Sequence, residues 1–277
     1  MIYLLGDVHG NFDHILPVIT EGCEDEQKTV IFLGDQEAPI PFEDCIRPLI
    51  DAGVAVWMIH GNHDTDSEEN WRNLQDSQHR NLHGRVVEIE GVRVAGLGGI
   101  FRGDIWYPDH VPTFDGAKNH RNYAAYEKHV RQTSGLKNRL AKMDRIQMEA
   151  VASPQWQGVL LGKSAQGKLL KHQSSIFPDV YDALADQQAD LLVTHEAPSC
   201  HRFGFATIDL LAQSMGVKTL FHGHHHISQD YAEWMERLGF MAYSVGFCGI
   251  SDQHGKVVMP GDFDQHKREA EKQKVNS

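Results

Sequence analysis

The sequence lacks three features that would place the protein in a membrane or outside the cell. No run of about 18 apolar residues occurs, so no membrane-spanning helix is expected. The opening residues, MIYLLGDVHGN, have no basic stretch ahead of an apolar segment and a cleavage site, so they predict a first strand and not a signal peptide. Cysteine is scarce, and no C-x-x-C spacing occurs among Cys23, Cys45, Cys200 and Cys248. We therefore expect reduced thiols and a cytoplasmic location.

Positive charge is also in short supply. The 277 residues include 26 Lys and Arg against 38 Asp and Glu, which gives a formal net charge of −12. This balance argues against a general nucleic-acid coat and against a membrane-surface protein. Segment 117–172 is the exception, because its eleven Lys and Arg outnumber its three acids. This basic segment is either a solvated helical face or a surface that recruits an anionic substrate.

Three apolar runs near the N-terminus predict buried strands, at 2–5, 29–33 and 54–59. Segments with helical spacing separate them, at 12–19 and 42–52. This alternation is typical of an α/β sheet with parallel strands, where sites lie beyond the carboxyl ends of the strands. A polar segment stands at that position after each run: Gly6-Asp7-Val8-His9, Gly34-Asp35 and Gly61-Asn62-His63-Asp64.

The same pattern returns in the C-terminal half, where run 191–194 leads to His195 and run 219–221 leads to His222-Gly223-His224-His225-His226. A single Asp, Asn or His after a strand is usually a turn residue, a helix cap or a hydrogen-bonded structural group. Five such segments together offer carboxylate, amide and imidazole ligands, in a chain unusually rich in histidine with 18 of them. This ligand set suits Mn²⁺, Fe, Zn²⁺ or Ni²⁺ better than Ca²⁺. We therefore expect a metal site where the strand ends converge.

The order of these segments resembles the calcineurin-like metallophosphoesterase superfamily, which has D-x-H, GD, GNHD, a strand-ending His and GHxH. The matching segments span residues 7–226, with 101 to about 178 outside the resemblance. The resemblance implies an α/β fold in which a two-sheet β-sandwich is flanked by helices in a four-layer αββα arrangement. We expect a single catalytic domain over 1–262 with a helical, basic insertion at about 101–178. A charged C-terminal tail would follow over 263–277.

The resemblance also implies a centre with two divalent metal ions, for which Mn²⁺ is favoured and Fe, Zn²⁺, Ni²⁺ and Mg²⁺ are alternatives. Two such ions bind phosphate oxygens and lower the pKa of a water molecule that attacks phosphorus. His63 would not be a ligand but would face the scissile phosphate and donate a hydrogen bond or proton. The implied ligands are Asp7, His9, Asp35 and His226 for one ion, and Asp35, Asn62, His195 and His224 for the other, with Asp35 bridging.

The chain departs from the phosphoprotein phosphatase branch of this superfamily. That branch continues the GD segment as GDxxDRG, whereas this chain has Ala38 and Pro39 in place of the second Asp and the Arg. In that branch the second Asp orients the catalytic histidine. Here Glu37 or Asp64 is left for that task, so Asp64 joins His63 as a catalytic candidate.

Three functions stay open. The leading hypothesis is a metal-dependent phosphoesterase for phosphate mono- or diesters, with Arg102 as a substrate-binding residue. Nucleotides or nucleic acid would reach it through the basic insertion. The alternatives are a Ser/Thr-type protein phosphatase and a non-catalytic metal-binding module on the same scaffold. Aromatic side chains in or near the insertion could supply stacking surfaces for bases, although some must be core: Trp106, Tyr107, Tyr123, Tyr126 and Trp156.

Overall fold

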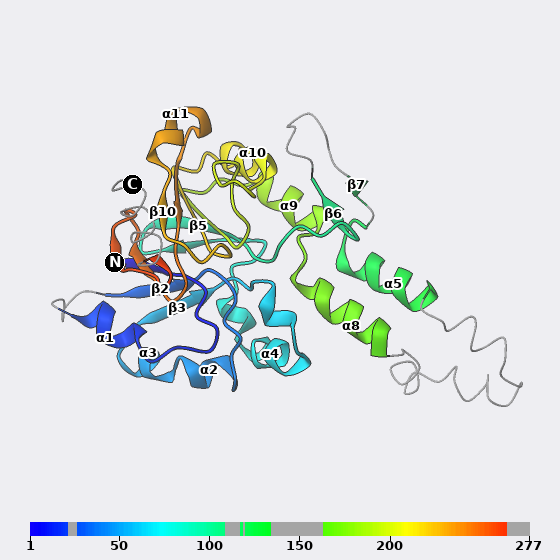
Figure 1. The fold of residues 1–277 in the computed structure, drawn as a ribbon, viewed down its shortest axis with the longest axis horizontal. Coiled ribbons are helices and arrows are strands. Elements are labelled where there is room, and N and C mark those ends of the chain that lie inside the picture. The colour runs from blue at the N-terminus through cyan, green and yellow to red at the C-terminus, as the bar shows by residue number, and fades with distance from the viewer. Residues whose placement is uncertain (22–26, 109–116, 119, 134–162, 265–277) are drawn as a thin grey trace, which may run out of the picture.

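The structure is a computed structural model that describes residues 1–21, 27–108, 117–118, 120–133 and 163–264. Figure 1 shows two sheets stacked on one another, with helices on their outer sides and with α5 and α8 projecting from one end. The described part of the chain forms the two mixed sheets flanked by helices that the resemblance implied. The helical stretch predicted near 136–151 lies outside the described residues.

The first sheet has the order β13-β12-β1-β2-β3, and its three N-terminal strands are parallel. Leu5 is paired with Phe32 and Phe32 with Met58, so these strands end at the same level. The polar segments that follow them therefore leave the sheet at one edge. The strands are β1 (Ile2–Leu5), β2 (Thr29–Phe32), β3 (Ala55–Met58), β12 (Ile250–Asp252) and β13 (Val257–Met259).

The second sheet has the order β10-β11-β9-β8-β5-β4, with antiparallel strands at both edges and four parallel strands between them. Leu97 is paired with Thr194 and Thr194 with His222, so the central strands again end together. The strands are β4 (Arg85–Ile89), β5 (Val92–Leu97), β8 (Leu191–Thr194), β9 (Thr219–His222), β10 (Gln229–Asp230) and β11 (Met241–Ser244). A separate hairpin pairs β6 (Trp106–Tyr107) with β7 (Ala117–Lys118).

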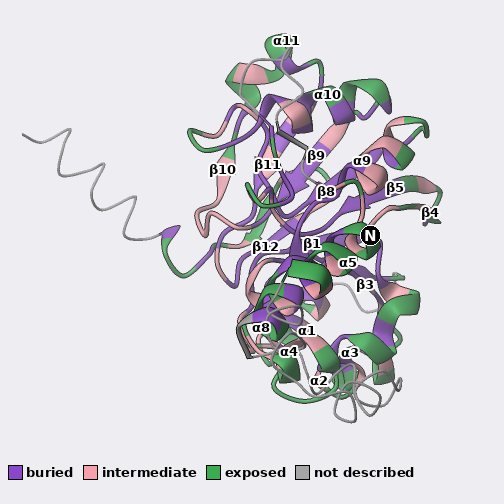
Figure 2. Cartoon of the chain, turned by 90° about the vertical axis from the view of Figure 1, so that its right-hand side faces the viewer, coloured by how far each residue is buried: buried purple, intermediate pink, exposed green. Residues whose placement is uncertain are grey.

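Alternation along the strands builds three apolar layers, because successive side chains point to opposite faces of a sheet. One layer fills the space between the two sheets, with Ile2 and Leu4 of β1 meeting Val193 of β8. The opposite faces of the same strands pack on helices, as Leu5 does in one outer layer and Leu192 in the other. Figure 2 shows the strands buried and the outward sides of the helices exposed. This is the four-layer αββα arrangement.

The helices cover the outer face of each sheet with apolar stripes. α10 buries Ile208, Leu211 and Ala212, which the i, i+3, i+4 spacing places on one side. Segment 42–52, predicted as one helix, is two short helices that meet at Ile46, whose φ of −93° and ψ of 4° are not helical. The helices are α1 (Ile15–Thr20), α2 (Phe42–Cys45), α3 (Arg47–Asp51), α4 (Glu68–Asn73), α5 (Tyr123–Thr133), α8 (Lys163–Lys171), α9 (Pro178–Ala185), α10 (Ala206–Ser214) and α11 (Met235–Leu238). Short 3₁₀ helices are η1 (His63–Thr65), η2 (Gln75–Arg80), η4 (His172–Ser174) and η5 (Ala232–Trp234).

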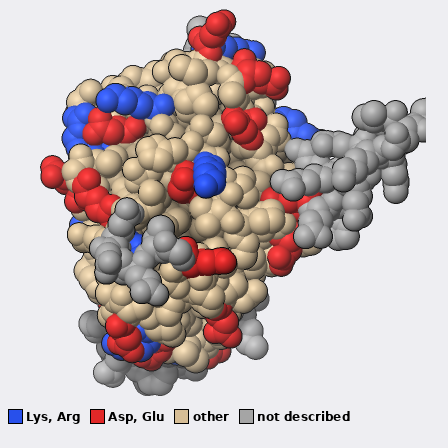
Figure 3. All heavy atoms as spheres, turned by 90° about the vertical axis from the view of Figure 1, so that its left-hand side faces the viewer, with Lys and Arg blue, Asp and Glu red and all other residues tan. Residues whose placement is uncertain are grey.

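The predicted insertion and tail are described only in part. Within 101–178 the described elements are β6, β7, α5, α8 and η4, and α5 and α8 pack against each other. Of the predicted tail only Phe263 and Asp264 are described, and Asp264 is buried, accepting hydrogen bonds from the backbone of Ser228 and Gly261. None of the described helices is long and apolar enough to cross a membrane. The face in Figure 3 carries scattered acidic side chains with few Lys or Arg between them.

Candidate metal centre

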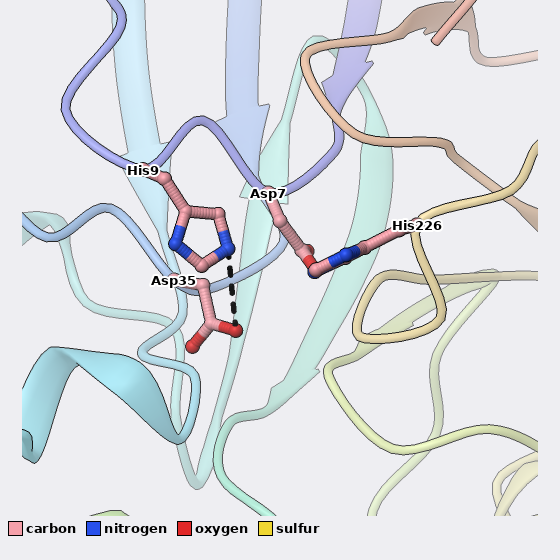
Figure 4. A group of neighbouring side chains, drawn as sticks. All are labelled: Asp7, His9, Asp35 and His226. Carbon is pink, nitrogen blue, oxygen red and sulfur yellow. Dashed lines mark ion pairs between the residues drawn. The ribbon is translucent and has the colours of Figure 1, made fainter. Parts of the chain in front are cut away.

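Four of the predicted ligands lie together at the shared edge of the sheets. Asp7, His9, Asp35 and His226 each offer a ligand atom, and these atoms lie within 4.8 Å of one another. We call these four residues the first ligand group. Figure 4 shows their side chains converging, with Asp7 and His9 from the loop after β1, Asp35 from the loop after β2 and His226 from the loop after β9. Nε2 of His226 is 3.1 Å from Oδ2 of Asp7, and Nε2 of His9 is 3.9 Å from Oδ2 of Asp35.

A second ligand group adjoins the first. Asp35, His195 and His224 again have ligand atoms within 4.8 Å of one another. Asn62 belongs with them, because its Oδ1 lies 3.0 Å from Nε2 of His195. Every residue predicted as a ligand is therefore in one of the two groups, and Asp35 is in both.

The carboxylate of Asp35 has one oxygen engaged and one free. Its Oδ1 accepts a hydrogen bond of 2.7 Å from the backbone N–H of His63. Its Oδ2 is buried and accepts no hydrogen bond from the described residues, although Nε2 of His195 is 3.3 Å away and Nε2 of His9 is 3.9 Å away. A buried carboxylate oxygen without a donor is costly. Its position between the two groups fits an oxygen shared by two cations.

Two of the histidines have one ring nitrogen held and the other aimed into the site. Nδ1 of His9 lies 2.5 Å from Oε2 of Glu37, and Nε2 of His9 is buried with no hydrogen-bond partner among the described residues. Nδ1 of His195 lies 2.8 Å from the carbonyl oxygen of Leu33. At His9 the contact at Nδ1 leaves Nε2 as the ligand atom, as metal-binding histidines usually have. Nε2 of His195 faces Asn62 and Asp35, and a bound cation would replace the proton that this nitrogen carries in the metal-free protein. The donor set therefore fits bound cations.

The backbone of the site is strained at the ligands themselves. His9, Asp35, His224 and His226 have φ values of 42°, 52°, 70° and 60°, in the left-handed region that favours glycine. Non-glycine residues in this region tend to cluster at functional sites, where the surrounding structure holds them. The strain brings side chains from turns to one point where a regular strand would direct them apart.

Glycines beside the candidate ligands allow close approach. A Cβ atom on Gly34, whose φ is +110°, would lie 2.3 Å from Nδ1 of His195. A Cβ atom on Gly223 would lie 2.4 Å from Oδ1 of Asp7. Both distances are too short for any side chain, so the ligands can pack against these turns only because glycine is present.

Burial and charge shift the pKa values of the ligands strongly. Burial lowers the pKa of His195, but the charge and hydrogen bond of Asp35, with smaller contributions from Asp7 and the carbonyl group of Leu33, together outweigh burial and raise that pKa to about 10. Burial raises the pKa of Asp35, and the nearby His195 more than reverses this, so the carboxylate stays ionised. Burial, and then the charge of His195, lowers the pKa of His224 to about 3. In the metal-free protein His195 and Asp35 therefore form a buried ion pair.

His63 lies beside the first ligand group, and its carboxylate partner is neither of the predicted residues. Its Nδ1 is 2.7 Å from Oδ2 of Asp66, one turn along η1. Glu37 is engaged with His9. Asp64 is fully buried and accepts hydrogen bonds of 2.8 Å from the backbone N–H groups of Gly61 and Glu37. The expectation that Glu37 or Asp64 orients His63 is thus corrected in favour of Asp66, whose signal in the sequence was only an acid three residues after the histidine.

The buried Asp64 ties two ligand loops together. Its two hydrogen bonds join the loop after β2 to the loop after β3. Burial, and then the charge of Asp35, raises the pKa of Asp64 to about 7. The backbone group it holds at Glu37 belongs to the residue that contacts His9. Asp64 is therefore placed to fix loop geometry.

Arg102 is anchored near the centre. Its Nη1 donates to the carbonyl oxygen of Ser174 at 2.7 Å, to Oγ of Ser174 at 3.2 Å and to Oγ of Ser175 at 3.1 Å. Burial lowers the pKa of Arg102, while the charges of Asp66, Glu196 and Asp35 act in the opposite direction. The guanidinium thus lies within electrostatic reach of the bridging position.

Further potential ligands surround the two groups. Glu196 and His225 offer atoms close to His224, and Glu37, His63 and Asp66 form another such set. His225 stacks on His201 with ring centroids 3.7 Å apart. These two sets were not predicted as ligand groups. His225 lies between two motif histidines and Glu196 directly follows one, and neither position has a spacing in the sequence that marks it as a ligand.

The chain is similar to proteins of one phosphoesterase family. A family model described as calcineurin-like phosphoesterase matches residues 1–228. An uncharacterized protein of Haemophilus influenzae (strain Rd) is 36% identical over 270 residues, covering 96% of this chain and 100% of that protein.

Two solved structures from Thermus thermophilus are more distant. TT1561 is 14% identical with a TM-score of 0.45, covering 92% of this chain and 96% of that one. A 5′-nucleotidase precursor is 14% identical with a TM-score of 0.34, covering 93% of this chain and 52% of that one. Likenesses at this distance do not bear on function. The match over residues 1–228 contains both ligand groups, so the chain belongs to the calcineurin-like phosphoesterase family and is a phosphoester hydrolase.

Proposed function

We propose that the protein hydrolyses phosphate mono- or diesters at a centre of two divalent metal ions, with nucleotides or nucleic acid as its substrates. The observation that carries this proposal is the position of Oδ2 of Asp35, which is buried and faces His9 of the first ligand group at 3.9 Å and His195 of the second at 3.3 Å. A single ion would leave the ligand atoms of one group without a bound metal. Two ions joined by this oxygen would use every ligand brought to the edge of the sheets.

Two cations held there would neutralise phosphate oxygens and lower the pKa of a water molecule. Asp7, His9, Asp35 and His226 would hold the first ion, and Asp35, Asn62, His195 and His224 the second. The set mixes carboxylate oxygen, amide oxygen and imidazole nitrogen, for which Mn²⁺ is the favoured occupant and Fe, Zn²⁺, Ni²⁺ and Mg²⁺ are the alternatives.

His63 has the position and the charge of a proton donor. Its ring lies 5.3 Å from that of His9, and its side chain keeps 42% of its surface exposed, so substrate can reach it. Burial lowers the pKa of His63, but Asp66 and Asp35 outweigh this and leave the pKa above its ordinary value. We assign it the donation of a hydrogen bond or proton to the phosphate or its leaving group, with Asp66 as its positioning residue.

Arg102 would bind the phosphate group of the substrate. Three hydrogen bonds from a single nitrogen to Ser174 and Ser175 fix the guanidinium near the site. A guanidinium held this way presents its remaining N–H groups in a defined direction, which suits recognition of phosphate. The charge would also assist in recruiting an anion into an acidic molecule.

The predicted route for nucleic acid through the basic insertion stays a prediction. Within the described part of the insertion Arg121 pairs with Asp182 at 2.8 Å and Arg131 with Glu127 at 2.6 Å, so these two charges are partly neutralised. Lys128 remains exposed on α5. Lys137 and Arg139, two further basic residues of the insertion, lie outside the described residues.

Two alternative functions make different demands. A protein phosphatase needs a carboxylate to orient His63, and Asp66 meets that demand. Turnover of phosphopeptides in preference to nucleotides would establish that function. A non-catalytic module would bind metal and turn over no phosphoester, and the complete set of candidate ligands argues against it. The described cysteines are free, which is consistent with the cytoplasmic location we propose.

The decisive variant is Asp35→Asn, which replaces the shared oxygen with an amide. We expect loss of bound metal, and hydrolysis of p-nitrophenyl phosphate and of bis-p-nitrophenyl phosphate with Mn²⁺ should fall at least about 100-fold. Asp51→Asn, on the exposed side of α3, is the matched control and should change neither quantity. Unchanged turnover in Asp35→Asn would reject the mechanism. The wild-type enzyme is then assayed with nucleotides, single-stranded nucleic acid and phosphopeptides to assign the substrate.

A further inference from the structure

A cavity of about 600 Å³ lies between the sandwich and the insertion, apart from the residues of the two ligand groups. Its sandwich side comes from the end of β3, from α4 and from η2, and its insertion side comes from the start of α5 and from the segment after α8. Figure 1 shows α4 on one side of this region and α5 and α8 on the other. Binding sites for small molecules occur preferentially at such junctions, in cavities of about 300–1,000 Å³.

The walls of the cavity combine aromatic rings with amide side chains. Trp71 lines it from the sandwich, and Tyr123 and Phe177 line it from the insertion. Gln75, Gln78, Asn122 and Gln173 supply the amides, of which Gln78 is already bonded within the protein at its nitrogen and its oxygen, and Asn122 at its oxygen. Rings offer flat stacking surfaces, and amides offer paired donors and acceptors. Together they match a planar group whose edge carries both donors and acceptors.

A buried histidine without partners lines the same cavity. His60 is 4% exposed, and both its ring nitrogens are buried with no hydrogen-bond partner among the described residues. Its ring stands edge-on to Trp71 with centroids 5.5 Å apart. Because neither ring nitrogen is accessible, His60 contributes no hydrogen-bonding nitrogen to the wall, and its part in the cavity is that of a ring packed beside Trp71.

The charge of the walls excludes the phosphate itself as the occupant. Among the described residues that line the cavity none is Lys or Arg, and Asp179 is the one carboxylate. An anion would therefore be repelled, whereas a neutral heteroaromatic ring would not. Of the amides, Gln75 donates from Nε2 to the carbonyl oxygen of Trp71, which leaves its Oε1 to accept from a ligand.

The cavity shares a wall with the metal centre. His60 directly precedes Gly61 and the ligand Asn62 in the chain. Ser175 lines the cavity, and its Oγ accepts a hydrogen bond from Arg102, the residue assigned to phosphate. The cavity and the metal centre are therefore neighbours, through segment 60–62 and through the contact of Arg102 with Ser175.

We propose that this cavity binds the base of a nucleoside. The base can belong to the substrate held at the metal centre, or to a free nucleoside that acts as an effector. Binding itself does not depend on hydrolysis, and only the first of these sources rests on the proposed function.

The test is calorimetric titration of full-length protein, stripped of metal with EDTA, with adenosine, guanosine, cytidine and uridine. Ala124→Trp fills the cavity from α5 without removing a polar contact, and Ala125→Trp, also exposed on α5 but outside the cavity lining, is its matched control. We expect one nucleoside per chain in the wild type, binding at least tenfold weaker in Ala124→Trp, and unchanged binding in Ala125→Trp. No binding of any of the four at millimolar concentration, or equal losses in both variants, overturns the proposal.

A second pair of variants guards against a change in folding. Tyr123→Phe keeps the ring and loses the hydrogen bonds of the hydroxyl group, which are to the carbonyl oxygen of Leu169 at 3.2 Å and to the side chain of Gln173, whereas Tyr123→Leu loses the stacking surface as well. Nucleoside binding should survive the first and fall at least tenfold in the second. Equal binding in both would show that the ring contributes nothing and would count against a base in the cavity.

The source of the base is read from kinetics with Mn²⁺. If Ala124→Trp raises KM for nucleoside monophosphates at least tenfold and leaves p-nitrophenyl phosphate unaffected, the base belongs to the substrate. If free nucleoside changes the rate on p-nitrophenyl phosphate in the wild type and not in Ala124→Trp, the cavity is an effector site. Binding without any phosphoester turnover would sustain the cavity and reject the proposed function, so the two failures are distinguishable.

Discussion

The contact between His63 and Asp66 leads to a prediction about which carboxylate, among Glu37, Asp64 and Asp66, orients the ring of His63. Asp66→Asn removes the negative charge 2.7 Å from Nδ1 of His63 and keeps the shape of the side chain. The two side chains are 42% and 60% exposed, so solvent screens the pair. Exposed pairs contribute about 0.5 kcal/mol, which corresponds to about 0.4 of a pKa unit for His63.

The sign follows from the raised pKa of His63. Asp66 favours the protonated ring, so its removal lowers the pKa, and activity that needs the proton is lost at a lower pH than in the wild type. Loss of orientation should reduce kcat about tenfold, the low end for residues that hold a functional histidine. Metal content should not change, because Asp66 is in neither ligand group.

The assay is the pH dependence of kcat/KM for p-nitrophenyl phosphate together with an NMR titration of His63. Glu37→Gln is the comparison, since Glu37 contacts His9 and its loss should weaken metal binding. The reasoning is refuted if Asp66→Asn leaves both the pKa of His63 and kcat unchanged. It is refuted as well if Glu37→Gln shifts the pKa of His63 by the larger amount.

Three further predictions concern protons, space and packing. Because the pKa of His195 is about 10 in the metal-free protein, binding of a metal ion at pH 8 must displace the proton of His195, and the affinity for the ion should rise as the pH increases toward 10. Calorimetry in two buffers of different ionisation enthalpy should therefore give different heats of metal binding. Equal heats would contradict the ion pair between His195 and Asp35. Gly223→Ala places a Cβ atom 2.4 Å from Oδ1 of Asp7, so metal content measured by mass spectrometry should fall, and a full complement of metal would show that the turn relaxes. Phe42→Ala, at a fully buried ring, should reduce the free energy of unfolding by about 3–5 kcal/mol in urea. Ile40→Ala, at a side chain 50% exposed, should change it by less than about 0.5 kcal/mol.

Strand positions were predictable because they depend on local patterns. The runs at Ile2–Leu5 and Leu191–Thr194 coincide with β1 and β8, since a buried strand needs little more than a short apolar run bounded by turn residues. The break at Ile46 was not predictable, because the apolar spacing continues across it. The same spacing argument fails wherever two short helices share one buried face.

That the candidate ligands lie together was predictable from the sequence, whereas their hydrogen-bond partners were not, and their binding of metal stays a prediction. Each ligand follows a strand, and the level ends of the strands bring the ligands together. The partner of His9 is 28 residues away in a separate loop, and the partner of His63 is an exposed acid without any motif. Such contacts depend on the path of the loops, and the cavity at His60 depends on how the insertion packs on the sandwich.

The left-handed backbone conformation at His9, Asp35, His224 and His226 lowers the stability of the fold, while it places the side chains that the proposed activity needs. Each such residue costs about 1–2 kcal/mol relative to a comfortable conformation, and glycine at the same position would relieve it. Selection for thermal stability alone should therefore enrich glycine at these four positions and erase the metal ligands. A library screened for both heat resistance and turnover would retain the four side chains and gain stability elsewhere.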